Sequence, residues 1–401
     1  MNLKNLNFKY ALVNIGYMLL ISGSLGFAFN YLSQVGFEPG VIGTVMSVVS
    51  LAGLFLGPIA GDLVDRSQKI TQKLFIIGSM IMCALAGSVL LMLPAGSLVI
   101  LPVIVVAFVC STIGMPMLNG MAFSYERFGG TINYGLCRGI GSAAYAVGSN
   151  LVGQLWAALG TSTLPLVVVA GALLTAGMTL LMPEVPRRAT TGTSGEKGAA
   201  EASLSIPQFF GRYRSLVPVI GALVLLYFCH NIVNTYMGAL LGTFETGAGV
   251  ESTQGTALFI QAMVELPTMF GFALLLKRMS VEKILAVAAI FYSIKHVLVL
   301  VACNAGSVPL FYAAMVLQML SFAAITPGIV YFANKHVAGA DQNKGQAVFA
   351  TANTVGGLLA SFVGGWMFEL IGVMPGLTVG VVASCAGTLL MLWGLRNSVR
   401  A

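Results

Sequence analysis

The chain is a succession of apolar runs separated by short polar connections. A helix needs about 20 apolar residues to cross the hydrocarbon core of a bilayer. Only 8% of the residues are charged, against about 25% in a soluble domain, so water is not the solvent for most of the chain. The sequence therefore predicts an all-α membrane protein with twelve transmembrane helices. Their approximate ranges are 8–33, 39–65, 72–93, 97–124, 132–158, 163–183, 215–244, 252–278, 282–303, 306–337, 343–370 and 375–396.

The distribution of basic residues supports this division and predicts an orientation. Lys and Arg stay on the cytoplasmic side when a membrane protein is inserted. All but two of the 20 basic residues lie at the chain ends or in every second connection, which predicts that both termini are cytoplasmic. The net charge of +7 then reflects insertion and not a nucleic-acid partner. We expect a multi-pass protein of a bacterial cell membrane, the inner or plasma membrane, in contact with the lipid bilayer.

The polar stretch 184–214 divides the twelve predicted helices into two sets of six. It begins near Pro183 and Pro186 and continues with Thr, Gly, Ser, Glu, Lys and Ala, a composition typical of a flexible linker. We predict a six-helix bundle at 1–183, a cytoplasmic linker at 184–214 and a second six-helix bundle at 215–401. Two such bundles, related by an axis along the membrane normal, would place a binding site between them near the bilayer midplane.

Three charged side chains lie deep within predicted spans, away from their ends: Arg138, Glu265 and Lys295. A charge at bilayer depth costs at least about 2.5–3.5 kcal/mol, so such residues usually face a cavity or a partner. Glu265 and Lys295 lie at similar depth on consecutive antiparallel helices, so they could pair. The pair could simply fix the register of two helices. Alternatively, Glu265 exchanges a proton as its exposure alternates, with Lys295 modulating that exchange.

Arg138 has no acidic partner on its own predicted helix. Its guanidinium is a rigid fork of donors suited to carboxylates or vicinal hydroxyls, so it contacts a substrate or braces two helices. Uncharged polar residues also fall within the spans, some to satisfy neighbouring helices and some to face a cavity. We assign the following residues to a substrate site: Arg138, Asn119, Lys295, His230 and Gln261. We assign Glu265 and Lys295 to proton coupling.

A further motif follows the second predicted helix, in the stretch Gly61-Asp62-Leu63-Val64-Asp65-Arg66-Ser67-Gln68-Lys69. Gly61 would allow close helix contact, and Asp65 near a helix end can accept hydrogen bonds or pair with a basic loop residue. Gly61, Asp65 and Arg66 would then form a gating latch, although the basic residues could equally serve insertion. The stretch resembles the signature of the major facilitator superfamily, with Gln68 where glycine is usual.

Other segments resemble the lactose-permease branch of that superfamily, which includes proton-coupled oligosaccharide, nucleoside and phenylpropionate carriers. Residues 133–142 are similar to the branch's entry into helix five, whose arginine contacts substrate, and this resemblance implies the same role for Arg138. Glu265 matches the branch's coupling glutamate, and Lys295 stands where the branch has arginine. Asn119 stands where lactose permease has a sugar-binding glutamate, and Ser321 where the branch has histidine.

These features predict a secondary active transporter that works by alternating access. We expect symport of protons with a small polar organic solute, and the resemblance favours a sugar or oligosaccharide. Three alternatives stay open. They are a carrier of organic or aromatic carboxylates that uses Arg138 and Lys295 as its anion site, a drug or metabolite exporter, and a non-transporting membrane sensor. The lack of a sizeable soluble domain argues against the sensor.

An enzyme is not expected. The six cysteines lie in apolar runs without CxxC or Cys/His spacing, and the three histidines lie in different predicted helices. This pattern predicts no metal site, cofactor or disulfide framework. We expect the protein to act as a monomer.

Overall fold

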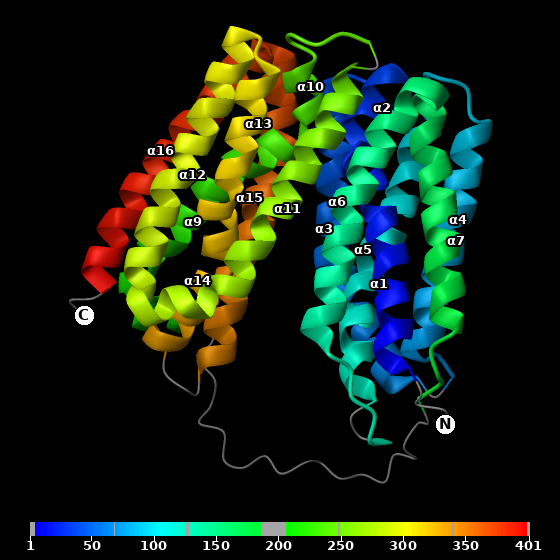
Figure 1. Cartoon of the computed structure of the whole chain (residues 1–401), viewed down its shortest axis with the longest axis horizontal. Coiled ribbons are helices and arrows are strands. Elements are labelled where there is room, and N and C mark those ends of the chain that lie inside the picture. Colours follow the sequence, from blue (N-terminus) through cyan, green and yellow to red (C-terminus); the bar gives the residue numbers. More distant parts are fainter. Residues whose placement is uncertain are drawn as a thin grey trace. The chain divides into compact units, whose positions relative to one another are not determined.

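The computed structural model describes residues 5–67, 69–125, 128–185, 206–247, 249–337 and 341–398. Within these ranges every regular element is a helix, and no strand occurs (Figure 1). The elements up to residue 180 are α1 Leu6–Ser24, α2 Ala28–Gln34, α3 Pro39–Arg66, α4 Gln72–Met92, α5 Ile100–Ser124, α6 Tyr134–Leu159, η2 Gly160–Ser162 and α7 Thr163–Leu180. The later elements are α8 Ile206–Arg212, η3 Arg214–Leu216, α9 Val217–Thr235, α10 Met237–Leu241, α11 Gly249–Arg278, α12 Val281–Ala305, α13 Val308–Val316, η4 Leu317–Leu320, α14 Phe322–His336, α15 Gln342–Ile371 and α16 Val373–Ser398.

The helices of the described residues make twelve potential membrane crossings. Eleven stretches there are long and apolar enough to span a bilayer, and one of them, Tyr134–Leu180, has 47 residues. A straight helix of that length would extend about 70 Å, roughly twice the hydrocarbon thickness. The stretch is in fact two helices, α6 and α7, because Gly160 takes a φ of 55° that ends α6. The predicted fold class of a twelve-helix, all-α membrane protein is confirmed.

Three crossings predicted as continuous helices are interrupted. The range 8–33 breaks between α1 and α2, the range 215–244 breaks at Tyr236, and the range 306–337 passes through the 3₁₀ turn η4. At the first break the carbonyl oxygen of Gly26 accepts a hydrogen bond from Gln254 Nε2 at 2.6 Å. A side chain from another helix thus hydrogen-bonds a backbone carbonyl that the break would leave without a partner. Such contacts allow a helix to be interrupted within the membrane.

The chain folds into two compact units. Unit 1 contains Met1–Arg187, Thr235–Met263 and Ser361–Glu369, and unit 2 contains Arg188–Asn234, Val264–Ala360 and Leu370–Ala401. Unit 1 thus includes two short pieces of the second half of the chain. The predicted division into bundles at 1–183 and 215–401, with a linker at 184–214, follows the order of the helices along the chain. It stays a prediction.

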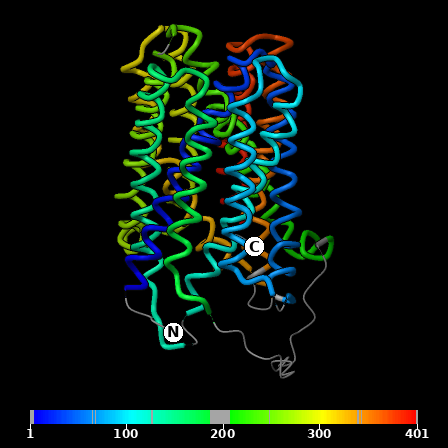
Figure 2. Tube along the Cα trace, turned by 90° about the vertical axis from the view of Figure 1, so that its right-hand side faces the viewer, coloured from blue at the N-terminus to red at the C-terminus, as the bar shows by residue number. Residues whose placement is uncertain are grey.

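Unit 1 is built around α1 and α4. Helix α1 packs against α6 and α7, α4 packs against α5 and α7, and α3 packs against α5. The long helices of the first half run back and forth along a common direction (Figure 2). Where α3 meets the α15 piece of this unit, a Cβ on Gly43 would lie 3.1 Å from the Cα of Gly365. Small residues therefore let two backbones nearly touch, which is how helices associate closely in lipid.

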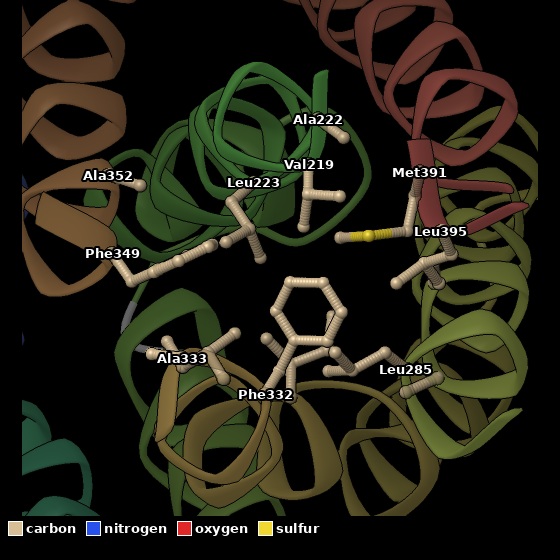
Figure 3. Packing of buried hydrophobic residues seen from close by; sticks show 14 of the residues in the cluster. Val219, Ala222, Leu223, Leu285, Phe332, Ala333, Phe349, Ala352, Met391 and Leu395 are labelled. Atoms are coloured by element: carbon tan, nitrogen blue, oxygen red, sulfur yellow. The ribbon is translucent and has the colours of Figure 1, made fainter. Parts of the chain in front are cut away.

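Unit 2 has a core of buried apolar side chains around α12, which packs against α13, α14 and α16. Figure 3 shows side chains from several helices meeting there, with the ring of Phe332 among Val219, Leu285 and Met391. All four of these side chains are fully buried. The core fixes how α9, α12, α14 and α16 are rotated about their axes, and so which polar side chains of unit 2 face one another.

The last part of the predicted linker is helical, which corrects the prediction of a flexible segment for those residues. Phe209 of α8 is fully buried in the unit 2 core. Arg212 Nη1 lies 3.6 Å from Asp341 Oδ2, and the Tyr213 hydroxyl donates to the same oxygen at 3.2 Å. These contacts hold α8 against unit 2. Residues 186–205 of the predicted linker lie outside the described residues.

The C-terminal end of α7 is capped by residues from two other elements. Lys73 Nζ donates to the carbonyl oxygens of Leu180 (3.0 Å) and Met182 (2.8 Å), and the Tyr125 hydroxyl donates to that of Pro183 (2.8 Å). A cation at this position also suits the negative end of the helix dipole. Burial raises the pKa of Tyr125 to about 12, so its hydroxyl stays a neutral donor at physiological pH.

Candidate functional site

Three polar side chains of unit 2 form a hydrogen-bonded chain inside a mainly apolar bundle. Lys295 of α12 donates through Nζ to Gln318 Oε1 at 2.5 Å. Gln318 Nε2 in turn donates to Glu265 Oε1 of α11 at 2.7 Å. Lys295 and Gln318 are fully buried, whereas Glu265 is half-buried. We call Glu265, Gln318 and Lys295 the polar triad.

The contact between Glu265 and Lys295 is indirect, whereas the sequence left a direct pair possible. Among the described residues no ion pair joins them, because the Gln318 amide lies between them. The amide oxygen faces the ammonium group and the amide nitrogen faces the carboxylate, so the amide dipole matches both charges. A buried charge without such partners would be costly, so the amide is part of what makes Lys295 tolerable here.

The backbone around Gln318 is what allows it to bridge the two charges. Gln318 lies in η4, the 3₁₀ turn between α13 and α14, and Ser321 at its end has φ −109° and ψ −96°. The Ser321 hydroxyl donates to the carbonyl oxygen of Leu317 at 2.8 Å and satisfies one group that the break frees. A 3₁₀ stretch in the middle of a helix often marks a functional hinge.

Beside the triad, His230 lies in a cluster of rings. It stacks on Phe322 with centroids 4.8 Å apart, and it lies 5.4 Å from Tyr292 and 6.3 Å from His296. Its Nε2 interacts with Asn234 Nδ2 at 2.9 Å, and His296 Nδ1 interacts with Ser384 Oγ at 2.8 Å. The histidines come from different helices, as predicted, and the structure brings two of them together.

In unit 1, Arg138 and Asn119 lie on α6 and α5. Arg138 is half-buried, and its Nη1 contacts the sulfur of Met18 at 3.7 Å. Among the described residues it forms no ion pair with a carboxylate. One helical turn earlier, the Tyr134 hydroxyl donates to Asn119 Oδ1 at 3.1 Å. The guanidinium therefore keeps most of its donors for other partners.

Gln261 lies on α11, one helical turn before Glu265, and is 8% exposed. It is grouped with unit 1, whereas Glu265 and the other triad residues belong to unit 2. Its assignment to a substrate site therefore stays a prediction.

The predicted gating latch is arranged differently from expectation. Arg66 Nε pairs with Asp62 Oδ1 at 2.6 Å within α3, and both side chains are well exposed. A Cβ on Gly61 would have the Met117 methyl, at 3.7 Å, as its neighbour among the described residues, so Gly61 makes no close helix contact there. The side chain of Asp65 lies outside the described residues. An exposed pair within one helix contributes only about 0.3–0.5 kcal/mol, so this pair is not a strong latch.

Comparison with protein-family models decides the family. Residues 10–376 match the model of the MFS_1 like family. The chain belongs to this family. It is a major facilitator superfamily transporter, a multi-pass membrane protein that carries a small-molecule substrate and is not an enzyme. No protein of curated function matches its sequence.

Solved structures of other MFS transporters share this fold. A mutant of the nucleoside transporter NupG superposes with a TM-score of 0.81 at 15% identity, covering 97% of this chain and 100% of that one. A bacterial homologue of the human lysosomal transporter Spinster gives 0.72 at 12% identity, with 99% and 98% covered. A mutant of the peptide transporter POT gives 0.72 at 13% identity, with 98% and 94% covered. At these identities the likeness shows the fold alone.

Two residues of this MFS transporter matter in the structure without standing out in the sequence. Gln318 is one polar residue among several within the spans, and nothing in the local pattern marks it as the bridge between two charges. Tyr134 holds Asn119, although its position at the start of a predicted helix gives no sign of that contact. A polar side chain inside an apolar run is the available signal, and it does not name a partner.

Proposed function

We propose that this MFS transporter couples proton movement to the uptake of a small polar organic solute by alternating access. The observation that carries the proposal is the polar triad, in which a half-buried carboxylate is joined through an amide to a fully buried lysine. Such groups are costly within a membrane and usually mark ion or substrate pathways. In this proposal Glu265 carries the proton and Lys295 modulates its exchange.

The amide of Gln318 gives the coupling a physical basis. With Glu265 ionised, Nε2 donates to the carboxylate and Oε1 accepts from Lys295, so these hydrogen bonds are matched. If Glu265 took up a proton and the amide turned to accept it, Nε2 would face the lysine ammonium, donor against donor. Protonation of Glu265 therefore weakens the link to Lys295. The hinge-like turn η4, which carries Gln318, would then be free to change its conformation.

For the substrate, we propose a hydroxyl-bearing solute, either a sugar or oligosaccharide or a nucleoside. The first follows from the lactose-permease-like segments, and the second is supported by the similarity of fold to a nucleoside transporter. Arg138 and Asn119 would contact it from unit 1, because the guanidinium keeps free donors that suit vicinal hydroxyls. His230, Gln261 and Lys295 would contact it from the second half of the chain.

The decisive experiment is the change Glu265→Gln in protein reconstituted into liposomes. The solute is first found by a binding screen of sugars, nucleosides and organic acids at two pH values. We expect Glu265→Gln to abolish accumulation driven by a proton gradient, because an amide cannot take up the proton. Exchange of labelled for unlabelled solute should persist, because it needs no net proton movement.

The matched control is Glu245→Gln, which removes a carboxylate from the connection between α10 and α11 in unit 1, whereas the triad belongs to unit 2. It should accumulate solute at the wild-type rate. Accumulation by Glu265→Gln that equals wild type would remove the residue from proton coupling.

A carboxylate carrier is the strongest alternative, because Arg138 and Lys295 are both cationic. In the binding screen such a carrier would bind organic acids and not sugars or nucleosides. Export from inverted vesicles would instead indicate a drug or metabolite exporter, and a lack of any flux would indicate a sensor. We further propose that the protein acts as a monomer in a bacterial inner membrane, with both termini cytoplasmic.

A further inference from the structure

Unit 1 contains a pocket lined by α2, α10, the C-terminal end of α6 and the first turn of α11. The proposed transport site does not include it. The volume of the pocket is about 440 Å³, within the range of small-molecule sites. It is lined by aromatic and polar side chains, among them Phe29, Asn30, Ser33, Trp156 and Glu251. All of these residues belong to unit 1, so the pocket is defined within one compact unit.

The charged group of this pocket is Glu251, in the first turn of α11. Glu251 is only 2% exposed. Its Oε1 accepts hydrogen bonds from Asn30 Nδ2 (3.0 Å) and Gln34 Nε2 (2.8 Å). Its Oε2 is buried and has no hydrogen-bond partner among the described residues, and the same holds for Asn30 Oδ1. Two buried oxygen acceptors, one of them on a carboxylate, are therefore left over beside the same pocket.

The Glu251 carboxylate has no basic partner in the part of the chain that the structure describes, where no Lys, Arg or His forms an ion pair with it. Burying an acceptor without a donor is costly, and burying an unpaired charge costs more. The arrangement is nevertheless firmly held, because Gln34 Oε1 also accepts from Trp156 Nε1 at 3.0 Å. The carboxylate is therefore fixed in position, with one buried oxygen that accepts no hydrogen bond from the described residues.

The rest of the lining decides which kind of cation fits. A bare metal ion would be satisfied by oxygen ligands alone and needs far less volume. Here Phe29 and Trp156 supply aromatic walls, and Trp156 is itself fixed by stacking on Phe27 with ring centroids 5.8 Å apart. Aromatic walls suit the apolar body of an organic cation, and a carboxylate beside them supplies the opposite charge.

We propose that this pocket binds a small organic ammonium ion, distinct from the solute of the polar triad. The ammonium group donates to Glu251 Oε2 and Asn30 Oδ1, and the apolar part of the ligand lies against Phe29 and Trp156. Binding at this place ties α11 to α2 and α6, because the ligand contacts all three. An amine in the surroundings would thereby stabilise the packing of unit 1.

The test is equilibrium binding of radiolabelled benzylammonium to the purified full-length protein in lipid nanodiscs. No ion gradient is applied, so the result does not depend on the proposed proton coupling. We expect saturable binding that Glu251→Gln weakens about tenfold or more, since a charge-assisted hydrogen bond is lost. The glutamine keeps an oxygen for Asn30 and Gln34. Benzyl alcohol, which has the same ring but no charge, should not compete.

The matched control is Glu369→Gln, another unit 1 carboxylate, whose Oε2 accepts from the backbone N–H of Gly40 at 2.9 Å. It should bind benzylammonium as wild type does. A second variant, Val250→Trp, fills the pocket and leaves the Glu251 hydrogen bonds in place, so it should also lose binding. Equal binding in the Glu251 and Glu369 variants, competition by benzyl alcohol, or displacement by sodium chloride at the same concentration would each overturn the proposal.

Discussion

The fully buried Lys295 is stabilised by a neutral amide and, one side chain further away, by a carboxylate. Lys295 donates to an amide oxygen, and the carboxylate of Glu265 is one side chain further away. This arrangement separates the two charges by a group that can turn, unlike a direct ion pair. A direct pair would be stable in one state, whereas a bridged pair can change with the conformation of Gln318.

The substitution Gln318→Leu removes the amide bridge and keeps about the same side-chain size. The Lys295 ammonium then loses the amide oxygen that accepts its hydrogen bond in a buried site. Leaving a buried donor without its acceptor typically costs about 1–3 kcal/mol, and more when the donor is charged. We expect a lower thermal unfolding temperature in detergent and loss of gradient-driven uptake.

The double variant Gln318→Leu with Lys295→Met should recover most of the lost thermal stability, because an apolar side chain replaces the buried ammonium that has lost its acceptor. Uptake driven by the gradient should stay lost. If the Gln318→Leu variant unfolded at the wild-type temperature, the amide of Gln318 would not be stabilising the buried Lys295 ammonium.

At the scale of elements, the helices of unit 1 approach closely where both contribute glycine. A Cβ on Gly43 of α3 would meet the carbonyl oxygen of Ser361, the Tyr236 hydroxyl and the Cα of Gly365. Tyr236 also donates to the Ser361 carbonyl oxygen. Because no apolar driving force brings helices together in lipid, this contact depends on shape. A single methyl group is enough to disturb it.

Gly43→Ala should therefore destabilise unit 1. The added methyl must push α15 away or break the Tyr236 hydrogen bond, and overpacking of this kind costs about 1–3 kcal/mol. The expected result is a lower thermal unfolding temperature in detergent.

Gly57→Ala is the control on the same helix, because a Cβ on Gly57 meets no described atom within 4 Å. It should unfold at or slightly above the wild-type temperature, since alanine favours helix more than glycine does. Equal unfolding temperatures for the two variants would mean that the α3–α15 contact does not restrain the protein.

At the scale of the whole molecule, the placement of basic residues along the chain sets the proposed orientation. Lys73 and Arg212 show that some of these residues also have structural partners, at the end of α7 and at Asp341. The two roles are compatible, because a lysine kept on one side of the membrane can also bind helix ends on that side. The orientation itself follows from the alternation along the sequence.

Reporter fusions check that orientation. Green fluorescent protein fused after Ala401 should fluoresce, and alkaline phosphatase at the same place should be inactive, because the proposed C-terminus is cytoplasmic. Alkaline phosphatase inserted after Gly96, in an exposed connection between α4 and α5, should be active. Active phosphatase after Ala401 would reverse the proposed topology.

The sequence was sufficient for the class of fold and for the approximate place of each crossing. It failed where a crossing is interrupted, because η4 and Tyr236 lie inside apolar runs that look continuous. It also left Glu251 out of the spans, because the predicted helix begins at 252 and the observed one begins at Gly249. The apolar pattern therefore gives no reason to expect a buried carboxylate at that position.

The apolar runs were enough to predict that this chain crosses a membrane about twelve times, and which charged residues lie within the crossings. Transfer of each run into lipid is a local and nearly additive free energy, so it can be summed along the chain. The folded structure was needed to show that Gln318 separates Glu265 from Lys295 and that Glu251 lines a pocket. Hydrogen-bond partners depend on how each helix is rotated against its neighbours, and that rotation is set by packing between residues far apart in the sequence.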